Sequence, residues 1–108
     1  MGRIQGQLLR GTTRLLVLSA LRDGELYGYE IAQKIRERSG GVFAVSEGSL
    51  YPALHALEED GALTASWRDS DKGPPRRYYR ITPKGGALLA EHEQEWTSFA
   101  AAMASTVA

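Results

Sequence analysis

The side chains in this sequence that could carry chemistry fall into a serine- and tyrosine-containing stretch and a basic segment. The first runs from Ser46 to Gly61 and reads SEGSLYPALHALEEDG. The second, from Arg68 to Lys84, carries six basic residues against two acidic ones. Hydroxyl and guanidinium groups bind phosphate oxygens and base edges, so both segments are typical of contact with a nucleic acid.

The sequence lacks the usual patterns of catalytic and metal sites. It contains no cysteine, which excludes disulfides, thiolate metal sites and thiol catalysis. His55 and His92 have no partner motif, no metal-ligand spacing occurs, and no glycine-rich phosphate loop follows a strand. We therefore expect no enzyme activity, no metal and no cofactor.

The formal net charge is zero, with 13 basic and 13 acidic residues, but the charges are unevenly placed. From Gly85 to Ala108 there are three acidic residues and no Lys or Arg, so residues 1–84 hold 13 bases against 10 acids. A chain with no net charge can therefore still carry a basic surface that contacts a nucleic acid.

The size and composition are those of one folded domain, with 108 residues, 43% of them hydrophobic and 24% charged. A chain this short often completes its core with a partner subunit, so we expect an oligomer. The longest apolar run, Leu15 to Leu21, is far below the ~20 residues of a membrane span. We expect a cytoplasmic protein with no membrane contact.

Apolar spacings of three and four predict helices over residues 7–22, 27–38 and 46–60, and a last helix from Pro83 to about residue 106. Residues 42–45 leave room for one small strand. The last helix opens with Gly85-Gly86, which predicts a loosely formed first turn.

Two strands are predicted by alternation. Residues 62–68 place Leu63, Ala65 and Trp67 on one, half-buried side, and residues 76–82 alternate again after a turn-rich loop at 69–75. The order of elements predicts a mainly α fold with a small β-hairpin wing. This is a winged helix-turn-helix over residues 1–84, with a C-terminal helix at 85–108 in the same single domain.

The helix at residues 46–60 has an unusual outward face. Leucines and Ala53 gather on one side, whereas Gly48, Tyr51, Pro52 and His55 share the other. Either Ser46 or Ser49 could be its N-cap, and Pro52 loses a helical hydrogen bond only in the first case. The N-terminal end suits a phosphate or base edges in a major groove. The alternative is that Pro52 only shapes the helix start and Tyr51 packs on a neighbour.

Three segments closely resemble the PadR family of bacterial transcriptional regulators: Tyr27-Gly28-Tyr29-Glu30-Ile31, the 46–61 stretch, and Arg77-Tyr78-Tyr79-Arg80-Ile81-Thr82-Pro83-Lys84-Gly85. The resemblance spans roughly residues 8–90. It implies a homodimeric, repressor-like winged-helix protein on a pseudo-palindromic DNA operator. The 46–60 helix would lie in the major groove and the 62–82 hairpin would form the wing.

The residues with an expected DNA role lie on this helix and on the wing. The wing would supply affinity through Arg76, Arg77 and Lys72, and because neighbouring strand residues alternate, only one of the two arginines needs to face DNA. The alternative for each of these three residues is a charged side chain that faces solvent and has no DNA contact. On the helix the resemblance implies DNA contact for Ser46, Gly48, Ser49, Tyr51, Pro52 and His55. The alternatives are that these residues only cap the helix, pack on a neighbour or face solvent.

The last helix carries an apolar seam at heptad-like spacing. In the PadR family this helix dimerises the protein, usually with the N-terminal helix. The interface expected here comprises Leu8, Leu89, His92, Trp96, Phe99 and Met103. Plain packing is the simpler interpretation, and a pocket beside Trp96 for a small planar effector is the alternative, consistent with drug-responsive family members.

Two functions remain open from sequence: sequence-specific DNA binding, and a winged-helix protein-interaction module without a DNA role.

Overall fold

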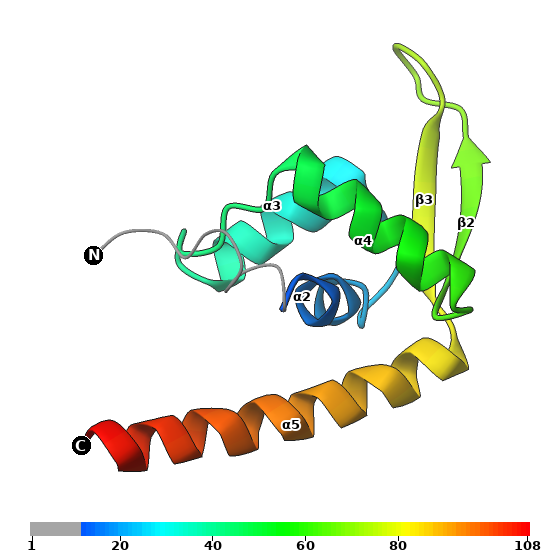
Figure 1. Ribbon diagram of the computed structural model, residues 1–108. Coiled ribbons are helices and arrows are strands. Elements are labelled where there is room, and N and C mark those ends of the chain that lie inside the picture. The colour runs from blue at the N-terminus through cyan, green and yellow to red at the C-terminus, as the bar shows by residue number, and fades with distance from the viewer. Residues whose placement is uncertain (1–11) are drawn as a thin grey trace.

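Residues 12–108, described by a computed structural model, form four helices and a three-stranded antiparallel sheet (Figure 1). In chain order the elements are α2 Thr13–Ala20, β1 Leu26–Tyr27, α3 Gly28–Arg38, α4 Glu47–Glu59, β2 Leu63–Arg68, β3 Arg76–Ile81 and α5 Pro83–Val107. The predicted fold class, a mainly α winged helix-turn-helix with a hairpin wing, is confirmed. Leu8 lies outside the described residues.

Helix α2 occupies the centre of the core, with α4 on one side of it and α5 on the other (Figure 1). Its Val17 and Leu18, and Leu21 at its C-cap, are fully buried. They belong to one apolar cluster that also includes Ile31, Ile35, Leu50, Leu54, Leu57, Leu63, Tyr79 and Leu89. Each fully buried aliphatic side chain stabilises the fold by about 1.5–3 kcal/mol, so this cluster holds α4 and the sheet in a defined relation.

The sheet has the strand order β1-β3-β2, with Tyr79 of β3 opposite Leu26 of β1 and Ala65 of β2. The two-residue strand β1 was missed because the sequence there was taken as the start of a helix. Residues 42–45, which leave room for at most one small strand, form none. Both sides of β3 are already paired, and Phe43 and Val45 pack on the core instead.

Helix α4 ends at Glu59, one residue before the predicted end at residue 60, and Gly61 follows its C-cap. Gly61 has a φ of 79°, in the left-handed region that favours glycine. The N–H of Ala62 bonds to the carbonyl of Leu57 at 2.8 Å, and the N–H of Gly61 to that of Glu58 at 3.0 Å, as in a Schellman cap. The cap turns the chain directly into β2, so the wing begins close to the end of α4.

The start of α5 is held firmly, which corrects the expected loose first turn. The hydroxyl of Thr82 accepts a hydrogen bond from the N–H of Gly85 and donates one to the carbonyl of Gly61. A Cβ at Gly85 would lie 2.2 Å from the carbonyl oxygen of Ala62 and 2.7 Å from Cγ1 of Ile81. Glycine at this position therefore permits close approach of α5 to the start of β2.

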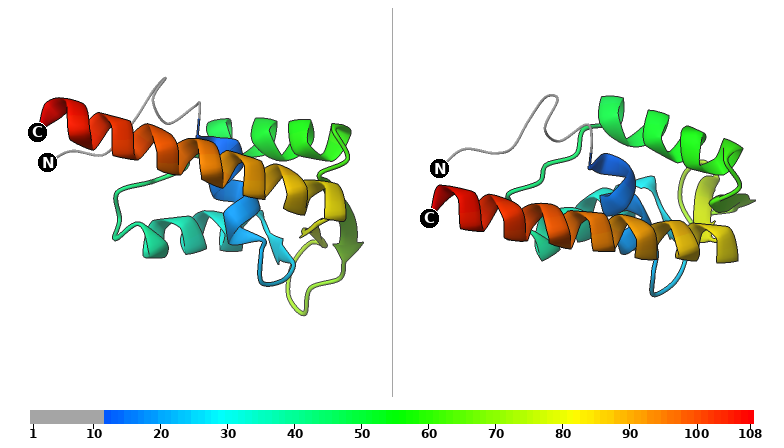
Figure 2. Two further views of the ribbon diagram at one scale, coloured as in Figure 1. Left: turned by 90° about the horizontal axis from the view of Figure 1, so that it is seen from below. Right: turned by 60° about the horizontal axis from the view of Figure 1, so that its bottom comes forward.

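Beyond this start, α5 runs along the molecule on the side away from α4 (Figures 1 and 2). Leu89 is buried in the core, whereas every residue from Glu93 to the C-terminus is exposed. Among residues 12–108 no helix is long and apolar enough to cross a membrane.

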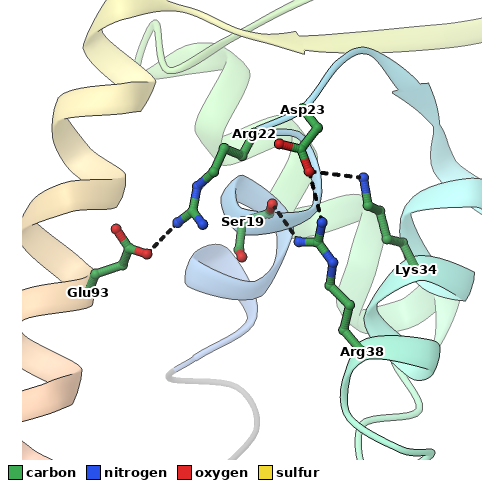
Figure 3. A network of polar contacts seen from close by, with 6 residues as sticks. All are labelled: Ser19, Arg22, Asp23, Lys34, Arg38 and Glu93. Atoms are coloured by element: carbon green, nitrogen blue, oxygen red, sulfur yellow. Dashed lines mark hydrogen bonds and ion pairs between the residues drawn. The ribbon is translucent and has the colours of Figure 1, made fainter.

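Ion pairs link the turn after α2 to both α5 and α3 (Figure 3). Arg22 pairs with Glu93 of α5. The neighbouring Asp23 accepts from Arg38 at 2.9 Å and lies 3.7 Å from Nζ of Lys34, both on α3. These exposed pairs contribute little stability individually.

Candidate nucleic-acid interface

The N-terminus of α4 is open to solvent. Ser46 is the N-cap residue, which settles the choice between Ser46 and Ser49. The carbonyl of Ser46 accepts from the N–H groups of Ser49 and Leu50, at 3.0 and 2.8 Å. Its hydroxyl points to the Ser49 hydroxyl, 3.4 Å away, and does not cap the helix. The first backbone N–H groups of α4 and both serine hydroxyls therefore remain near one another at the positive end of the helix dipole.

Pro52 consequently lies in the second turn, where it costs one helical hydrogen bond. Its ring nitrogen has no hydrogen for the carbonyl of Gly48, four residues earlier. Both residues are exposed, so water can satisfy that carbonyl. His55 is also exposed on this face, and Leu50, Ala53, Leu54 and Leu57 are buried on the opposite one, as the sequence pattern predicts.

Tyr51 lies across the gap between α4 and the start of α3. Its hydroxyl is 2.6 Å from the position that a Cβ would take at Gly28, so the ring covers this glycine. The side chain is nonetheless 40% exposed. Tyr51 thus packs on a neighbour, which is one interpretation of the sequence, and also leaves part of its side chain exposed, which the other interpretation, DNA contact, requires.

Between α4 and the wing lies a groove of about 410 Å³. Its lining is mainly aromatic and basic and comes from five elements and the loop before β3: Tyr27, Gly28, Tyr51, His55, Trp67, Pro75, Arg76, Arg77 and Tyr79. A second groove of about 400 Å³ follows the other side of the α4 N-terminus and includes Tyr29, Gln33, Arg36 and Ser46. The two grooves flank the N-terminal half of α4 with hydroxyl, amide, imidazole and guanidinium groups, and the second also contains the carboxylate of Glu37.

The two wing arginines have different surroundings. The guanidinium of Arg76 lies 4.5 Å from the ring centre of Tyr27, the residue is exposed, and no carboxylate within residues 12–108 pairs with it. Arg77 points to α4, where its Nη2 donates to Oε2 of Glu58 at 2.7 Å. Arg76 therefore presents an uncompensated charge, whereas the charge of Arg77 is balanced.

The rest of the wing differs from the simple alternating pattern. Trp67 was predicted on the half-buried side of its strand, but it is 68% exposed, and this prediction is wrong. It lies opposite Arg77 near the loop end of the wing, beyond the core. Lys72 is exposed in the connecting loop, and Arg68 is neutralised by Glu25 while its guanidinium lies over Tyr78.

Tyr79 anchors the wing in the core. It is 2% exposed, and burial raises the pKa of its hydroxyl above the ordinary value, while the nearby Arg77 charge acts in the opposite direction. The neutral phenol is thus the form that the folded protein favours.

On α5 the expected seam is divided between core and surface. Leu89 is 4% exposed within its own subunit, so it is not free to form an intersubunit surface, and this part of the expected interface is corrected. His92 is half-buried beside Glu95. Trp96, Phe99 and Met103 are each about half exposed, and the rings of the first two stack with centres 5.6 Å apart.

The family described as "Transcriptional regulator PadR-like family" matches residues 17–91, which include α3, α4, the wing and the start of α5. The chain belongs to this family. It is accordingly a PadR-like transcriptional regulator and not an enzyme.

Known transcriptional regulators match over most of the chain. "Transcriptional regulator Rv3488" of Mycobacterium tuberculosis is 44% identical over 82 residues, or 76% of this chain and 73% of the relative. The solved structure of a transcriptional regulator from Clostridium thermocellum has a TM-score of 0.82 at 32% identity and covers 91% of this chain and 95% of its own. "Negative transcriptional regulator PadR" of Bacillus subtilis is 29% identical over 69 residues, 64% of this chain and 38% of the relative.

Several groove residues of this PadR-like chain escaped the sequence interpretation. The alternation of its strand predicts a half-buried Trp67. Gln33 and Arg36 belong to no motif, and they lie on a helix whose pattern indicates only packing on the core. The role of Glu58 was also missed, because an acidic residue on a helix gives no sequence signal that its partner lies on a strand 19 positions later.

Proposed function

We propose that this protein binds a double-stranded DNA operator through the N-terminal half of α4 and the wing. The observation that carries this proposal is the arrangement of the N-terminal half of α4. Its open N–H groups and serines adjoin one groove at Ser46, and its Tyr51 and His55 line a second groove together with Arg76. Helix N-termini favour phosphate oxygens, and a guanidinium matches them with two donors. Phosphate contacts would position the protein, and the exposed Tyr51 and His55 would reach base edges.

The flat outward face of α4 supports a close approach to DNA. Gly48 carries no side chain and Pro52 carries only a compact ring, so the helix backbone meets no long side chain from these positions. The wing loop with Lys72 extends beyond α4 (Figure 1) and would contact the backbone of the adjacent groove. Residues 1–84 thus form the DNA-binding part in this proposal.

The DNA-bound form would be a homodimer joined through residues 85–108. Trp96, Phe99 and Met103 form an apolar stripe on α5, whose buried residues within residues 12–108, Gly85 and Leu89, lie in its first two turns. Pairing the stripe with that of a second copy would remove it from water. A two-fold dimer would bind half-sites separated by about one DNA turn, roughly 34–36 Å.

In this proposal binding blocks transcription, as the name of the Bacillus subtilis negative regulator indicates for that protein. A small planar effector could enter the interface by stacking on Trp96 and would then release the operator by changing the angle between the subunits. The aromatic pair of Trp96 and Phe99 supports this part of the proposal.

The test is a salt titration of DNA binding by fluorescence anisotropy. Promoter DNA adjoining the gene and a random duplex are titrated with the wild type and with Arg76→Ala. Counterion release predicts that log K falls steeply as log[salt] rises. Arg76→Ala should make this slope shallower by about 1. A flat response between about 50 and 200 mM salt refutes DNA binding, and absence of binding to either duplex would favour the protein-interaction alternative.

A further inference from the structure

The ion pair between Arg77 and Glu58 joins the wing to the helix proposed to read DNA. Arg77 lies on β3 and Glu58 on the last turn of α4, and their side chains are only 33% and 31% exposed. Their 2.7 Å contact spans 19 residues of sequence. A charged hydrogen bond that is partly shielded from water contributes more than a fully exposed pair.

The rest of the Arg77 side chain is also enclosed. Its guanidinium carbon lies 5.6 Å from the ring centre of Tyr79 and 6.0 Å from that of Trp67. Its Nε is buried and has no hydrogen-bond partner within residues 12–108. Because this donor is shielded, DNA cannot engage the guanidinium through the fork that includes Nε, and one edge of the group is occupied by Glu58.

We infer that Arg77 is a positioning residue, which holds the wing at a set distance from α4 through Glu58, and that it supplies no phosphate contact. This inference rests on the proposed DNA binding. The pair carries no net charge, so it adds nothing to the attraction of phosphates. Its effect on DNA is to place Arg76, the next residue on β3, at a defined position relative to the α4 N-terminus.

The variant Glu58→Gln tests whether Arg77 contacts phosphate or positions the wing, because the two roles predict opposite changes in DNA affinity. If Arg77 contacts phosphate, Glu58→Gln removes a repelling carboxylate, frees Arg77 and strengthens DNA binding. If Arg77 positions the wing, Glu58→Gln weakens binding, by about fivefold or more, although the protein becomes more positive. Glu59→Gln is the matched control. Glu59 borders the same side of α4 and has no ion pair within residues 12–108, so its loss should leave affinity equal or slightly higher.

The salt dependence separates positioning from contact a second time. Arg77→Met keeps an apolar stem but removes the charge, and it should lower affinity about as much as Glu58→Gln without changing the slope of log K against log[salt]. Arg76→Ala should lower that slope by about 1. The double variant Arg77→Met/Glu58→Gln should bind no more weakly than the poorer single variant, because both remove one interaction. A slope reduced by about 1 in Arg77→Met, or stronger binding by Glu58→Gln, overturns the inference.

A measurement without DNA distinguishes failure of this inference from failure of the proposed function. With 5-fluorotryptophan incorporated, the two tryptophans give separate fluorine NMR signals, assigned through Trp96→Phe. Both Glu58→Gln and Arg77→Met should shift the Trp67 signal and speed amide exchange in β2 and β3, while Glu59→Gln leaves them unchanged. If Glu58→Gln affects neither signal nor exchange, the pair does not hold the wing, whether or not the protein binds DNA.

Discussion

The contact between Gly85 and the start of β2 predicts opposite effects for one chemical change at adjacent positions. In Gly85→Ala the new Cβ would lie 2.2 Å from the carbonyl oxygen of Ala62, which also accepts a 3.0 Å hydrogen bond from the N–H of Thr82. In Gly86→Ala the new Cβ would meet nothing within 4 Å. Both positions lie in the first turns of α5, so the helical preference for alanine over glycine is similar.

The magnitudes follow from these distances. Atoms in contact are at best separation near 3.5–4.0 Å, so the start of α5 in Gly85→Ala must move by roughly 1 Å. Overpacking of this kind costs about 1–3 kcal/mol, which exceeds the ~0.5–1 kcal/mol that alanine contributes to a helix. Gly85→Ala should therefore lower the free energy of unfolding by about 1–2 kcal/mol, and Gly86→Ala should raise it by up to about 1 kcal/mol.

The assay is urea unfolding followed by far-UV circular dichroism. All variants must be compared at one protein concentration, because the stability of an oligomer depends on it. The two variants should have midpoints on opposite sides of the wild-type value with similar m-values. If both variants stabilise the protein to the same extent, the close packing of α5 on Ala62 does not exist in solution, and the explanation for the glycine is refuted.

Three further predictions concern the site, the seam and the wing. Gly28→Ala should weaken DNA binding with little loss of stability, because its Cβ displaces only the hydroxyl end of Tyr51; unchanged affinity would mean that the position of Tyr51 is unimportant. Trp96→Ala and Met103→Lys should shift the protein toward monomer in sedimentation velocity, and an unchanged dimer would exclude the α5 stripe as the interface. Because burial raises the pKa of Tyr79 above 10.0, its neutral form stabilises the fold fully below about pH 10, and this contribution disappears as the pH rises through the raised pKa. Tyr79→Phe should lose less stability than the wild type above that pH in urea unfolding, and an identical loss would contradict the assignment.

The sequence by itself determined which elements form and which faces they bury. Leucines at helical spacing, glycine at the end of α4 and Thr82-Pro83 before α5 act over one or two turns, so their consequences can be predicted locally. The outward set of Gly48, Pro52 and His55 was evident for the same reason. The PadR-like motifs then connected these elements to a family.

Only the tertiary structure decided how separate elements meet. The two-residue strand β1 exists because β3 offers it a partner, and Trp67 is exposed because it lies near the loop end of the wing, beyond the core. Arg76 and Arg77 are chemically identical and adjacent, yet one stacks on Tyr27 and the other pairs with Glu58 of α4. Their roles depend on distances across the fold, and no local spacing in the sequence encodes the side-chain partner that a residue acquires when distant segments pack.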